Sequence, residues 1–323
     1  MKSLRINCQL FLYHTIIAIA DYGNITKAAE ALFITQSGLN QQLIRLEKEL
    51  NIQLFERNKR HLHLTQAGEI YVNHAREMIK LKHNAYSMIQ DLADNITGDI
   101  FWGLPFEHGV DMFLYVSTAF NKRYPGITIH LEEHKVSDQH EMLSKGLLDL
   151  IFVMLTDKDK LDNEYIHLCN EKLVLGIPIQ HPMAQYAAPP GDPLSTISLS
   201  HFRDDSFCLM FAGSTQRTII DPLFTHAGFQ PNLFCESTMN RTLSKLVEYN
   251  LCCTIMPQSY ARFNNKVAWF YLDENPEWEW SIAHSHSMHL TKPTRYLIQL
   301  AKDYAHKMEE YWAENCIGNP NLI

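Results

Sequence analysis

Uncharged hydrogen-bonding side chains gather at the front of one predicted helix, in the stretch TQSGLNQQLIRLEKEL that begins at Thr35. Leucines at helical spacing predict a buried face: Leu39, Leu43, Leu46 and Leu50. The first turns of the other face carry amides and a hydroxyl: Gln36, Ser37, Asn40 and Gln41. Amides can pair bidentately with adenine in the major groove, and hydroxyls adapt to several base edges. The helix is therefore suited to reading double-stranded DNA.

Other polar and basic residues are candidates for contacts to the DNA backbone. One set has groups suited to phosphate oxygens: Thr26, Thr35 and Gln42. Arg45, further along the predicted recognition helix, is also a candidate for a DNA contact. A second set lies in a basic tip further along the chain, suited to the backbone or the minor groove: Arg57, Lys59 and Arg60. For any one of these residues the alternative is an ordinary solvated surface, so the prediction depends on the group.

The segments around this helix predict a winged helix-turn-helix. Residues 4–21 have an amphipathic helical pattern, Gly23-Asn24 marks a turn, and Thr26 is expected to cap a short helix from Lys27 to Phe33. Two helices joined by so short a turn are typical of helix-turn-helix domains. The segment 52–65 places the basic tip between two short alternating runs, which predicts a β-hairpin wing.

A long helix is predicted from Thr65 to about residue 95. Its inward positions recur at heptad-like spacing: Tyr71, Ala75, Met78, Lys82, Ala85, Ile89 and Leu92. A solitary helix of this length needs a partner to bury such a stripe. We therefore expect the chain to form a dimer through this helix, the alternative being packing on its own domain.

Strand and helix patterns alternate from Gly98 onward, which predicts a mainly parallel sheet covered by helices. The expected boundaries are 1–64 for the winged helix-turn-helix domain, 65–95 for the linker and dimerisation helix, and 96–323 for an α/β body. The body is expected to have two lobes, residues 96–165 with 269–323 and residues 166–268.

Charge and composition agree with a soluble protein that binds a polyanion. The 323 residues carry a formal charge of −8, yet residues 1–65 hold eight Lys or Arg and five Asp or Glu, giving +3 against −11 for the rest. Such asymmetry favours a nucleic-acid partner for the head. Seven scattered cysteines indicate a reducing cytoplasm rather than a disulfide framework. No stretch is apolar and long enough to span a membrane, and the polar residues within the N-terminal apolar run argue against a signal peptide.

The stretch NITKAAEALFITQSGLNQQLIRLEKELNIQLFERNKRHLHLTQAGE, residues 24–69, resembles the DNA-binding segment of LysR-type transcriptional regulators. The matching positions are Thr26, Ala28, Ala29, Gln36, Leu39, Leu46, Glu47, Leu50, Leu54, Phe55, Arg57, Leu64, Thr65, Ala67 and Gly68. Weaker matches run through the body. There are also departures, because Ser37-Gly38 replaces the usual Pro-Ala, and Asn250 and Cys252 stand where glycines usually sit.

The resemblance implies an N-terminal winged helix-turn-helix, a long linker helix and a two-lobed α/β effector domain like a periplasmic binding protein. It implies a sequence-specific regulator that assembles as a dimer or a dimer of dimers. It also implies that a small effector, whose identity the sequence leaves open, is held between the lobes and modulates DNA binding.

Three segments are candidates for effector contacts, because ligands of α/β bodies sit at strand carboxyl ends and helix N-termini. They contain Pro105, Phe106, Glu107 and His108; Ala212, Gly213, Ser214 and Thr215; and Ser237 and Thr238. The serines and threonines could equally be ordinary helix caps. Glu107 would repel a carboxylate unless His108 or an arginine offset it, so we expect an effector that is amine-bearing, neutral or metal-associated.

Other classes of protein remain as alternatives. The chain has no catalytic motif of the common kinds, so we predict no enzyme, no catalytic residue and no cofactor. A solute-binding protein and a DNA-binding scaffold without an effector are the rival interpretations. The stretch HSHSMH at 284–289 could chelate a metal and Cys208 or Cys235 could act as a redox switch, but neither is assigned a site.

Overall fold

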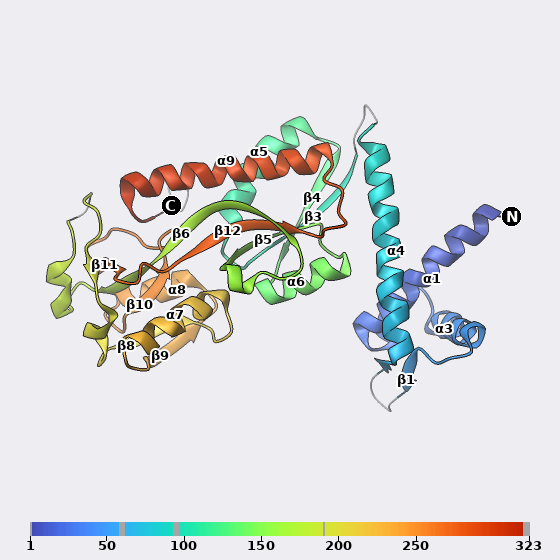
Figure 1. The fold of residues 1–323 in the computed structure, drawn as a ribbon, viewed down its shortest axis with the longest axis horizontal. Helices are drawn as coiled ribbons and strands as arrows, with labels where there is room; N and C mark the ends of the chain where they lie inside the picture. The colour runs from blue at the N-terminus through green and yellow to red at the C-terminus, as the bar shows by residue number, and fades with distance from the viewer. Residues whose placement is uncertain (1, 58–61, 93–96, 190, 319–323) are drawn as a thin grey trace. The chain divides into compact units, whose positions relative to one another are not determined.

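The computed structural model describes residues 2–57, 62–92, 97–189 and 191–318. The chain divides into two compact units (Figure 1). Unit 1 is Met1–Leu92 with Ser287–His289, and unit 2 is Ala93–His286 with Leu290–Ile323. No helix in the described ranges combines the length and the apolar character that crossing a bilayer requires.

Unit 1 opens with a winged helix-turn-helix. Its elements are α1 (Lys2–Tyr22), α2 (Ile25–Ala31), α3 (Gln36–Leu50), β1 (Phe55–Arg57) and β2 (Leu62–Leu64). The two strands pair antiparallel, with Phe55 opposite Leu64, which confirms the predicted wing. Leu39, Leu43 and Leu46 of α3 are buried and pack against apolar residues of α1 and α2. Leu50 was expected on the same buried face, but it is 43% exposed at the end of the helix. Burial of the other three leucines fixes which face of α3 is turned outward.

The short turns of unit 1 are set by helix caps. Asn24, rather than Thr26, caps α2, because its Oδ1 accepts hydrogen bonds from the backbone N–H groups of Thr26 and Lys27. Thr26 therefore lies inside the first turn, which corrects the expected cap. Thr35 caps α3 by accepting from Gly38 N at 3.2 Å. Both caps satisfy N–H groups that a helix start leaves without partners.

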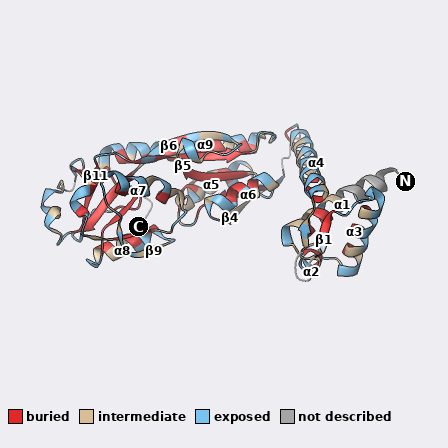
Figure 2. Cartoon of the chain, turned by 60° about the horizontal axis from the view of Figure 1, so that its bottom comes forward, coloured by how far each residue is buried: buried red, intermediate tan, exposed pale blue. Residues whose placement is uncertain are grey.

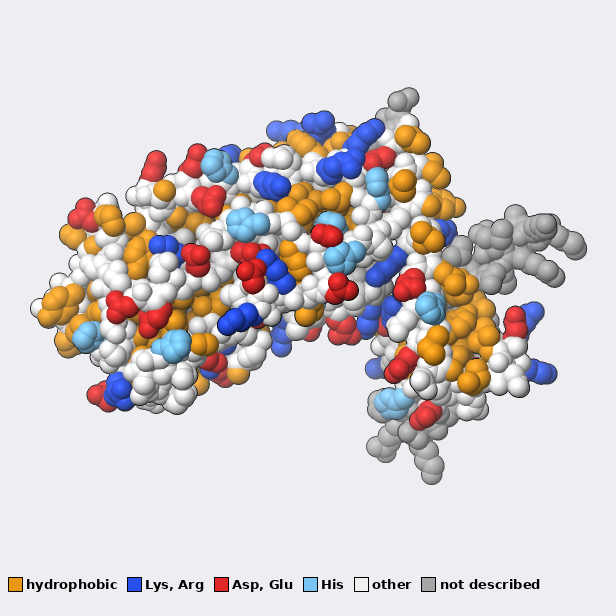
Figure 3. Space-filling view, viewed as in Figure 1, with side chains coloured by type: hydrophobic (Ala, Val, Ile, Leu, Met, Phe, Trp, Pro, Cys, Tyr) orange, Lys and Arg blue, Asp and Glu red, His pale blue; other side chains and the backbone are white. Residues whose placement is uncertain are grey.

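The long helix α4 (Gln66–Gln90) follows, capped by Thr65. A Cβ at Gly68 would lie 2.0 Å from Leu54 O, so only glycine allows this close approach of the helix to the wing. Val72 and Ala75 are buried in unit 1, but further along the helix Leu81 is 71% exposed and Ile89 is also exposed. Hydrophobic side chains gather along one edge of α4 (Figure 3).

Unit 2 contains the remaining elements. In chain order they begin with β3 (Gly98–Leu104), α5 (Val110–Arg123), β4 (Ile127–Glu133), α6 (Val136–Lys145), β5 (Leu150–Leu155), β6 (Glu164–Pro178) and β7 (Thr196–Ile197). They continue with β8 (Ser206–Met210), α7 (Thr215–His226), β9 (Asn232–Ser237), α8 (Asn240–Glu248), β10 (Thr254–Pro257), β11 (Val267–Leu272), β12 (Glu277–His284) and α9 (Lys292–Asn315). Short 3₁₀ turns lie at Asp157–Asp159, Pro182–Tyr186 and Leu199–Phe202.

The main sheet is mixed rather than mainly parallel, which corrects the expectation from sequence. Among the described strands its order is β4-β3-β5-β12-β6-β11-β7, with β10 also pairing to β6. Strand β3 is parallel to β4 and β5, whereas β12 is antiparallel to both β5 and β6. Strand β6 also pairs antiparallel with β10 and β11, so antiparallel pairs begin at β12 and continue into the part of the sheet that follows it.

We call β3, β4 and β5 with α5, α6 and α9 lobe 1, and β7 to β11 with α7 and α8 lobe 2. The first half of β6 pairs with β12, while Leu173–Pro178 pairs with β10 and β11 in lobe 2. In Figure 2 the strands are largely buried while the helices show one buried face. Both lobes therefore have a core of their own and share a continuous strand.

Candidate functional site

The outward face of α3 carries the predicted base-reading residues. Thr35, Gln36, Ser37, Gln41 and Arg45 are exposed, and Asn40 is half-buried. Because Leu39, Leu43 and Leu46 on the opposite face are buried, these polar groups share one accessible face at the start of the helix. This is the placement that a recognition helix requires.

The candidates for backbone contacts have different surroundings. Thr26 is exposed in the first turn of α2. Gln42 is half-buried, and its Oε1 accepts a hydrogen bond from Thr15 Oγ1 at 3.2 Å, so this group helps to join α3 to α1. Arg57 ends β1 opposite Leu62, but its side chain, together with Lys59 and Arg60, lies outside the described residues.

A cavity of about 300 Å³ lies between the lobes of unit 2. It opens where β3, β5, β8 and β9 end and where α6, α7 and α8 begin, the location at which α/β folds bind ligands. Its lining is Pro105, Phe106, His108, Lys135, Val136, Ser137, His140, Met154, Leu155, Asp159, Leu161, Met210, Phe211, Gly213, Ser214, Thr215, Gln216, Thr218, Thr238, Asn240 and Trp278. Most of this surface is apolar.

Most of the predicted effector residues meet in this cavity, and three do not. Those that line it are Pro105, Phe106, His108, Gly213, Ser214, Thr215 and Thr238. Glu107, Ala212 and Ser237 are absent from the lining. Ser237 instead bonds locally to the backbone of Met239. Ser214 also caps α7 by accepting from Arg217 N, so it has the structural role that was the alternative for such residues.

Glu107 points at the start of α8 rather than into the cavity. Its Oε2 accepts from Asn240 N at 2.6 Å and its Oε1 accepts from Arg241 N at 3.1 Å. Arg241 Nε lies 3.6 Å from the same carboxylate. The side chain is only 4% exposed, so this charge is held inside the protein by lobe 2 although it belongs to lobe 1.

Three side chains in the cavity wall have buried polar atoms without a hydrogen bond among the described residues: His108 at Nε2, His140 and Asn240. His140 of α6 is 7% exposed and both of its ring nitrogens lack a hydrogen bond, as does Oδ1 of Asn240, which is 2% exposed. Burial lowers the pKa of His140 below its usual range, which favours the neutral imidazole. One ring nitrogen is then a donor and the other an acceptor. These groups are placed to bind a hydrogen-bonding ligand.

A buried carboxylate lies behind the cavity wall. Glu171 of β6 accepts hydrogen bonds from Trp278 Nε1 at 2.8 Å, Trp280 Nε1 at 2.6 Å and Ser259 N at 3.0 Å. His108 Nε2 is 3.9 Å from its Oε2, at charge-contact rather than hydrogen-bond distance. Glu171 thus orients Trp278 by a hydrogen bond and lies near the ring of His108, and both of these residues line the cavity.

The guanidinium of Arg217, near the start of α7, is bonded within lobe 2 and is not available as a counterion for an acidic ligand. Its Nε donates to Asp221 at 2.6 Å, and Nη1 donates to Glu236 at 2.6 Å and to Met210 O at 3.0 Å. Burial alone would lower the pKa of Arg217, but the two carboxylates raise it above its usual range. The arginine therefore links α7 to β8 and β9.

The two cysteines considered as redox switches have weakly acidic thiols. Hydrogen bonding to Cys252 and burial raise the pKa of Cys208, whose Sγ lies 3.6 Å from Leu243 O. Burial also raises the pKa of Cys235. Reactive cysteines need a lowered pKa, so neither thiol has the surroundings of a redox sensor.

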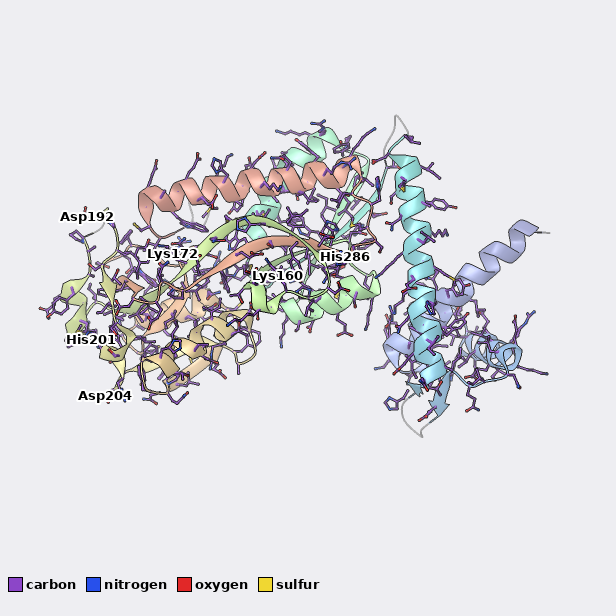
Figure 4. All side chains as sticks on the ribbon, viewed as in Figure 1. Lys160, Lys172, Asp192, His201, Asp204 and His286 are labelled. Carbon is purple, nitrogen blue, oxygen red and sulfur yellow. The ribbon has the colours of Figure 1, made fainter. Side chains whose placement is uncertain are left out.

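The histidine-rich stretch is engaged in ion pairing. His286 bonds to Glu164 at 2.7 Å and to Asp162 at 3.1 Å at an exposed edge of unit 2 (Figure 4). Hydrogen bonding to Glu164 raises the pKa of His286. Within the described ranges, no group of three or more His, Cys, Asp or Glu side chains is placed to hold a metal ion.

A wider depression of about 690 Å³ follows the outer face of α5. It is lined by Tyr115, Lys122, Arg123 and Tyr296 among others, and the guanidinium of Arg123 lies 4.6 Å from the Tyr296 ring centroid. It is an open surface away from the strand ends, and it brings together none of the predicted effector residues. The smaller cavity between the lobes is therefore the better candidate.

Sequence reasoning missed several residues of this site. His140, Asn240 and Trp278 line the cavity, and Glu171 supports it. Asn240 is the first residue of α8 and lies just beyond the end of β9, a position at which α/β folds contact ligands, so it could have been inferred. Glu171 is a single acidic residue in an apolar strand, and no pattern in the sequence indicates that it supports the cavity.

Both units match described protein families. Residues 10–69 match the bacterial regulatory helix-turn-helix protein, lysR family, and residues 109–306 match the LysR substrate binding domain. The chain is 29% identical over 249 residues to YybE of Bacillus subtilis (strain 168), an uncharacterized HTH-type transcriptional regulator, covering 77% of this chain and 82% of that protein. It is 28% identical over 271 residues to the HTH-type transcriptional regulator AlsR of the same organism, covering 81% and 86%.

Solved structures show the same fold. A full-length OxyR variant from Pseudomonas aeruginosa aligns with a TM-score of 0.66 at 21% identity, over 91% of this chain and 96% of that one. Full-length CbnR complexed with its target DNA aligns with a TM-score of 0.54 at 19% identity, over 91% and 99%. With a helix-turn-helix domain and a LysR substrate binding domain together spanning most of its length, the chain belongs to the LysR family of DNA-binding transcriptional regulators.

Proposed function

We propose that this regulator binds promoter DNA through the exposed polar face of α3, and that a small molecule in the cavity between the lobes alters this binding. The main observation behind this proposal is that α3 has a buried apolar face and, opposite it, an exposed polar face. Buried leucines hold α3 in the domain, while Gln36, Ser37 and Gln41 remain accessible. Gln36 and Asn40 supply the amides suited to adenine, with Ser37 and Gln41 beside them.

The proposal places Thr26, Thr35 and Arg45 against phosphates, together with the wing residues Arg57, Lys59 and Arg60. Gln42 contributes less, because its carbonyl is already bonded to Thr15. The net charge of +3 over residues 1–65 makes only a modest electrostatic contribution to the affinity of one head for DNA. Useful affinity therefore requires two heads on one assembly.

Pairing of two chains through α4 supplies the second head. Met78, Leu81, Ile89 and Leu92 are exposed on the C-terminal half of this segment in the single chain. Apolar residues at this spacing are buried when two such helices pack together. The protein therefore assembles as a dimer, or as a dimer of dimers, and binds two half-sites on the DNA.

The effector acts by favouring one arrangement of the lobes. A ligand shifts a conformational equilibrium only if it binds one state better than the other. The cavity is lined from both lobes, by His140 of lobe 1 and Asn240 of lobe 2 for example, so a ligand that spans it contacts both. The proposal further divides the chain at residues 1–64, 65–95 and 96–323, places it in the cytoplasm and gives it no catalytic role.

DNA binding is tested by fluorescence anisotropy with labelled DNA fragments from the region upstream of the gene that encodes this protein. The expected result is a nanomolar to micromolar affinity that falls as salt rises. Gln36→Ala and Asn40→Ala should each weaken specific binding by roughly 1–3 kcal/mol, the cost of a lost bidentate base contact. Gln230→Ala, which removes an exposed amide from unit 2, is the matched control and should have no effect.

Binding that is insensitive to salt, or unaffected by removal of both Gln36 and Asn40, would contradict the proposed recognition face. The effector role is tested separately, by adding metabolite mixtures to the purified chain and following its thermal unfolding. A compound that stabilises the protein and also changes its affinity for DNA is the expected outcome.

A further inference from the structure

The carboxylate of Glu107 occupies the N-terminus of α8. Helix α8 runs from Asn240 to Glu248, and Met239 at its N-cap makes no side-chain hydrogen bond. Glu107 supplies the missing acceptors, through its bonds to the backbone N–H groups of Asn240 and Arg241. The start of a helix carries partial positive charge, so a carboxylate there is favourable.

This contact joins segments that are far apart in the sequence. Glu107 follows β3 of lobe 1, whereas α8 belongs to lobe 2. Its backbone has a φ of +66°, a left-handed conformation that is uncommon for a residue with a side chain. The conformation turns the side chain of Glu107 toward α8, while its neighbours Phe106 and His108 line the cavity.

The cavity beside this contact has polar groups of a different kind. Oδ1 of Asn240 and both ring nitrogens of His140 are buried and have no partner within the described part of the chain. The charged side chains in the lining are Lys135 and Asp159, and they are of opposite sign. Lys135 is exposed, with its Nζ 5.0 Å from the ring centroid of Phe211, while Asp159 bonds to Thr156.

We propose that Glu107 is a resident anion that occupies the anion-binding N-terminus of α8 beside the cavity, so that the natural protein selects uncharged ligands over carboxylates. The contact with α8 that an acidic effector could make is made by the protein itself. The groups left for a ligand include the amide oxygen of Asn240 and the imidazole of His140. They suit a compact, largely apolar molecule with a hydroxyl or an amide group.

The proposal rests on the proposed function only in taking this cavity as the effector site. A second carboxylate near the start of α8 would meet the charge of Glu107 and find the N–H groups of Asn240 and Arg241 already bonded. Removal of the resident carboxylate should therefore convert the site into one that accepts small carboxylates.

The test measures thermal unfolding of the full-length chain with acetate as the probe. Glu107→Ala should lower the Tm by about 5 °C or more, because charge-assisted hydrogen bonds to two backbone groups are lost. Sodium acetate should restore much of this loss, relative to sodium chloride at the same ionic strength. Acetamide, which is similar in size but uncharged, should restore none. The natural protein should show no stabilisation specific to acetate.

Two further variants sharpen the comparison. Glu107→Gln keeps the volume of the side chain and one good acceptor, so it should lose less stability and should not respond to acetate. Glu248→Ala removes a carboxylate from the other end of α8, where Glu248 pairs with Lys245 at 2.6 Å, and acetate should not restore its loss. If Glu107→Ala does not fold in chloride, its refolding yield in acetate provides the same comparison.

The proposal is overturned if acetate stabilises the natural protein as much as Glu107→Ala, or if acetate and acetamide act alike on Glu107→Ala. It is also overturned if removal of the carboxylate leaves the Tm unchanged. These measurements use neither DNA nor an effector. A failure to bind promoter DNA would contradict the proposed function and leave this result standing, and the converse also holds.

Discussion

Replacement of Glu171 by glutamine tests whether a buried carboxylate holds the cavity wall in place. In the natural protein one oxygen of Glu171 accepts from both Trp278 and Trp280, and the other accepts from Ser259 N. Glutamine has one oxygen and one NH2 group. Whichever way the amide turns, its NH2 group faces at least one buried N–H group, and both donors then lack an acceptor.

The loss of stability follows from counting those donors. Each buried donor without a partner costs about 1–3 kcal/mol, so two of them cost roughly 2–6 kcal/mol. We expect Glu171→Gln to lower the free energy of unfolding by about 3 kcal/mol, which corresponds to a fall in Tm of roughly 6–12 °C for a unit of this size. The two tryptophans at the site make urea unfolding followed by tryptophan fluorescence the direct assay.

Glu277→Gln is the control, because Glu277 is an exposed acid on the same strand as Trp278. It should change the free energy of unfolding by less than about 0.5 kcal/mol. Equal effects of the two substitutions would refute the reasoning, and so would an unchanged stability of Glu171→Gln.

The same carboxyl predicts how stability depends on pH. Burial alone would raise the pKa of Glu171, but His108 and the hydrogen bonds from Ser259 and Trp278 bring it below its ordinary value of 4.5. A carboxyl whose pKa is depressed on folding stabilises the protein above its unfolded pKa, and this stabilisation is lost as pH falls through the folded pKa. The difference between the natural protein and Glu171→Gln should therefore be largest above about pH 4.5 and shrink in acid. A difference that grows on acidification would contradict this assignment.

Three further variants have expected outcomes. Leu43→Ala removes a fully buried side chain from unit 1 and should cost about 2–5 kcal/mol, measured by circular dichroism during urea unfolding. Leu81→Glu with Ile89→Glu should shift the protein from dimer to monomer in sedimentation experiments, and an unchanged mass would argue against pairing through α4. Gly109→Ala places a Cβ 2.6 Å from Leu104 Cδ2 at a φ of +85°, so we expect a loss of about 2 kcal/mol or more in thermal unfolding, whereas full stability would mean that the loop relaxes freely.

Much of the helix-turn-helix could be predicted because its signals are local. The spacing of Leu39, Leu43 and Leu46 gives the buried face of α3, and Thr35 stands where a cap is needed. The prediction that Thr26 caps α2 was wrong, and the reason is also local. Asn24 and Thr26 are both competent caps, and the turn after α1 brings the Asn24 side chain to the free N–H groups.

The site between the lobes could be predicted only in part. Pro105, Ser214 and Thr238 lie at ends of strands that periodicity identifies, and the fold brings them to one cavity. The partner of Glu107 is 133 residues away, so no local pattern indicates that its charge is bound by α8. Glu107 was expected to face a ligand, whereas its side chain faces the protein.

Asn250 illustrates how a departure from the family can keep the backbone conformation. It stands where glycine is usual, and its φ is +59°, in the left-handed region that asparagine tolerates better than most residues. The neighbouring Cys252 packs into the core of lobe 2. The sequence alone could not distinguish this accommodation from a changed loop.

The course of β6 through both lobes limits how the protein can respond to a ligand. The strand passes from pairing with β12 to pairing with β10 and β11 without leaving the sheet, and the ladder with β12 shifts register between Trp280 and Ser281. Bulges of this kind are where sheets bend and coil. Because hydrogen-bonded strands join the two lobes, we expect the lobes to rotate relative to one another by twisting of the sheet. We do not expect the wide hinge opening that flexible linkers would allow. Ligand binding should therefore produce a small rotation of one lobe relative to the other. The backbone amides of β6 where it passes from lobe 1 to lobe 2 should be among the slowest in the chain to exchange with solvent.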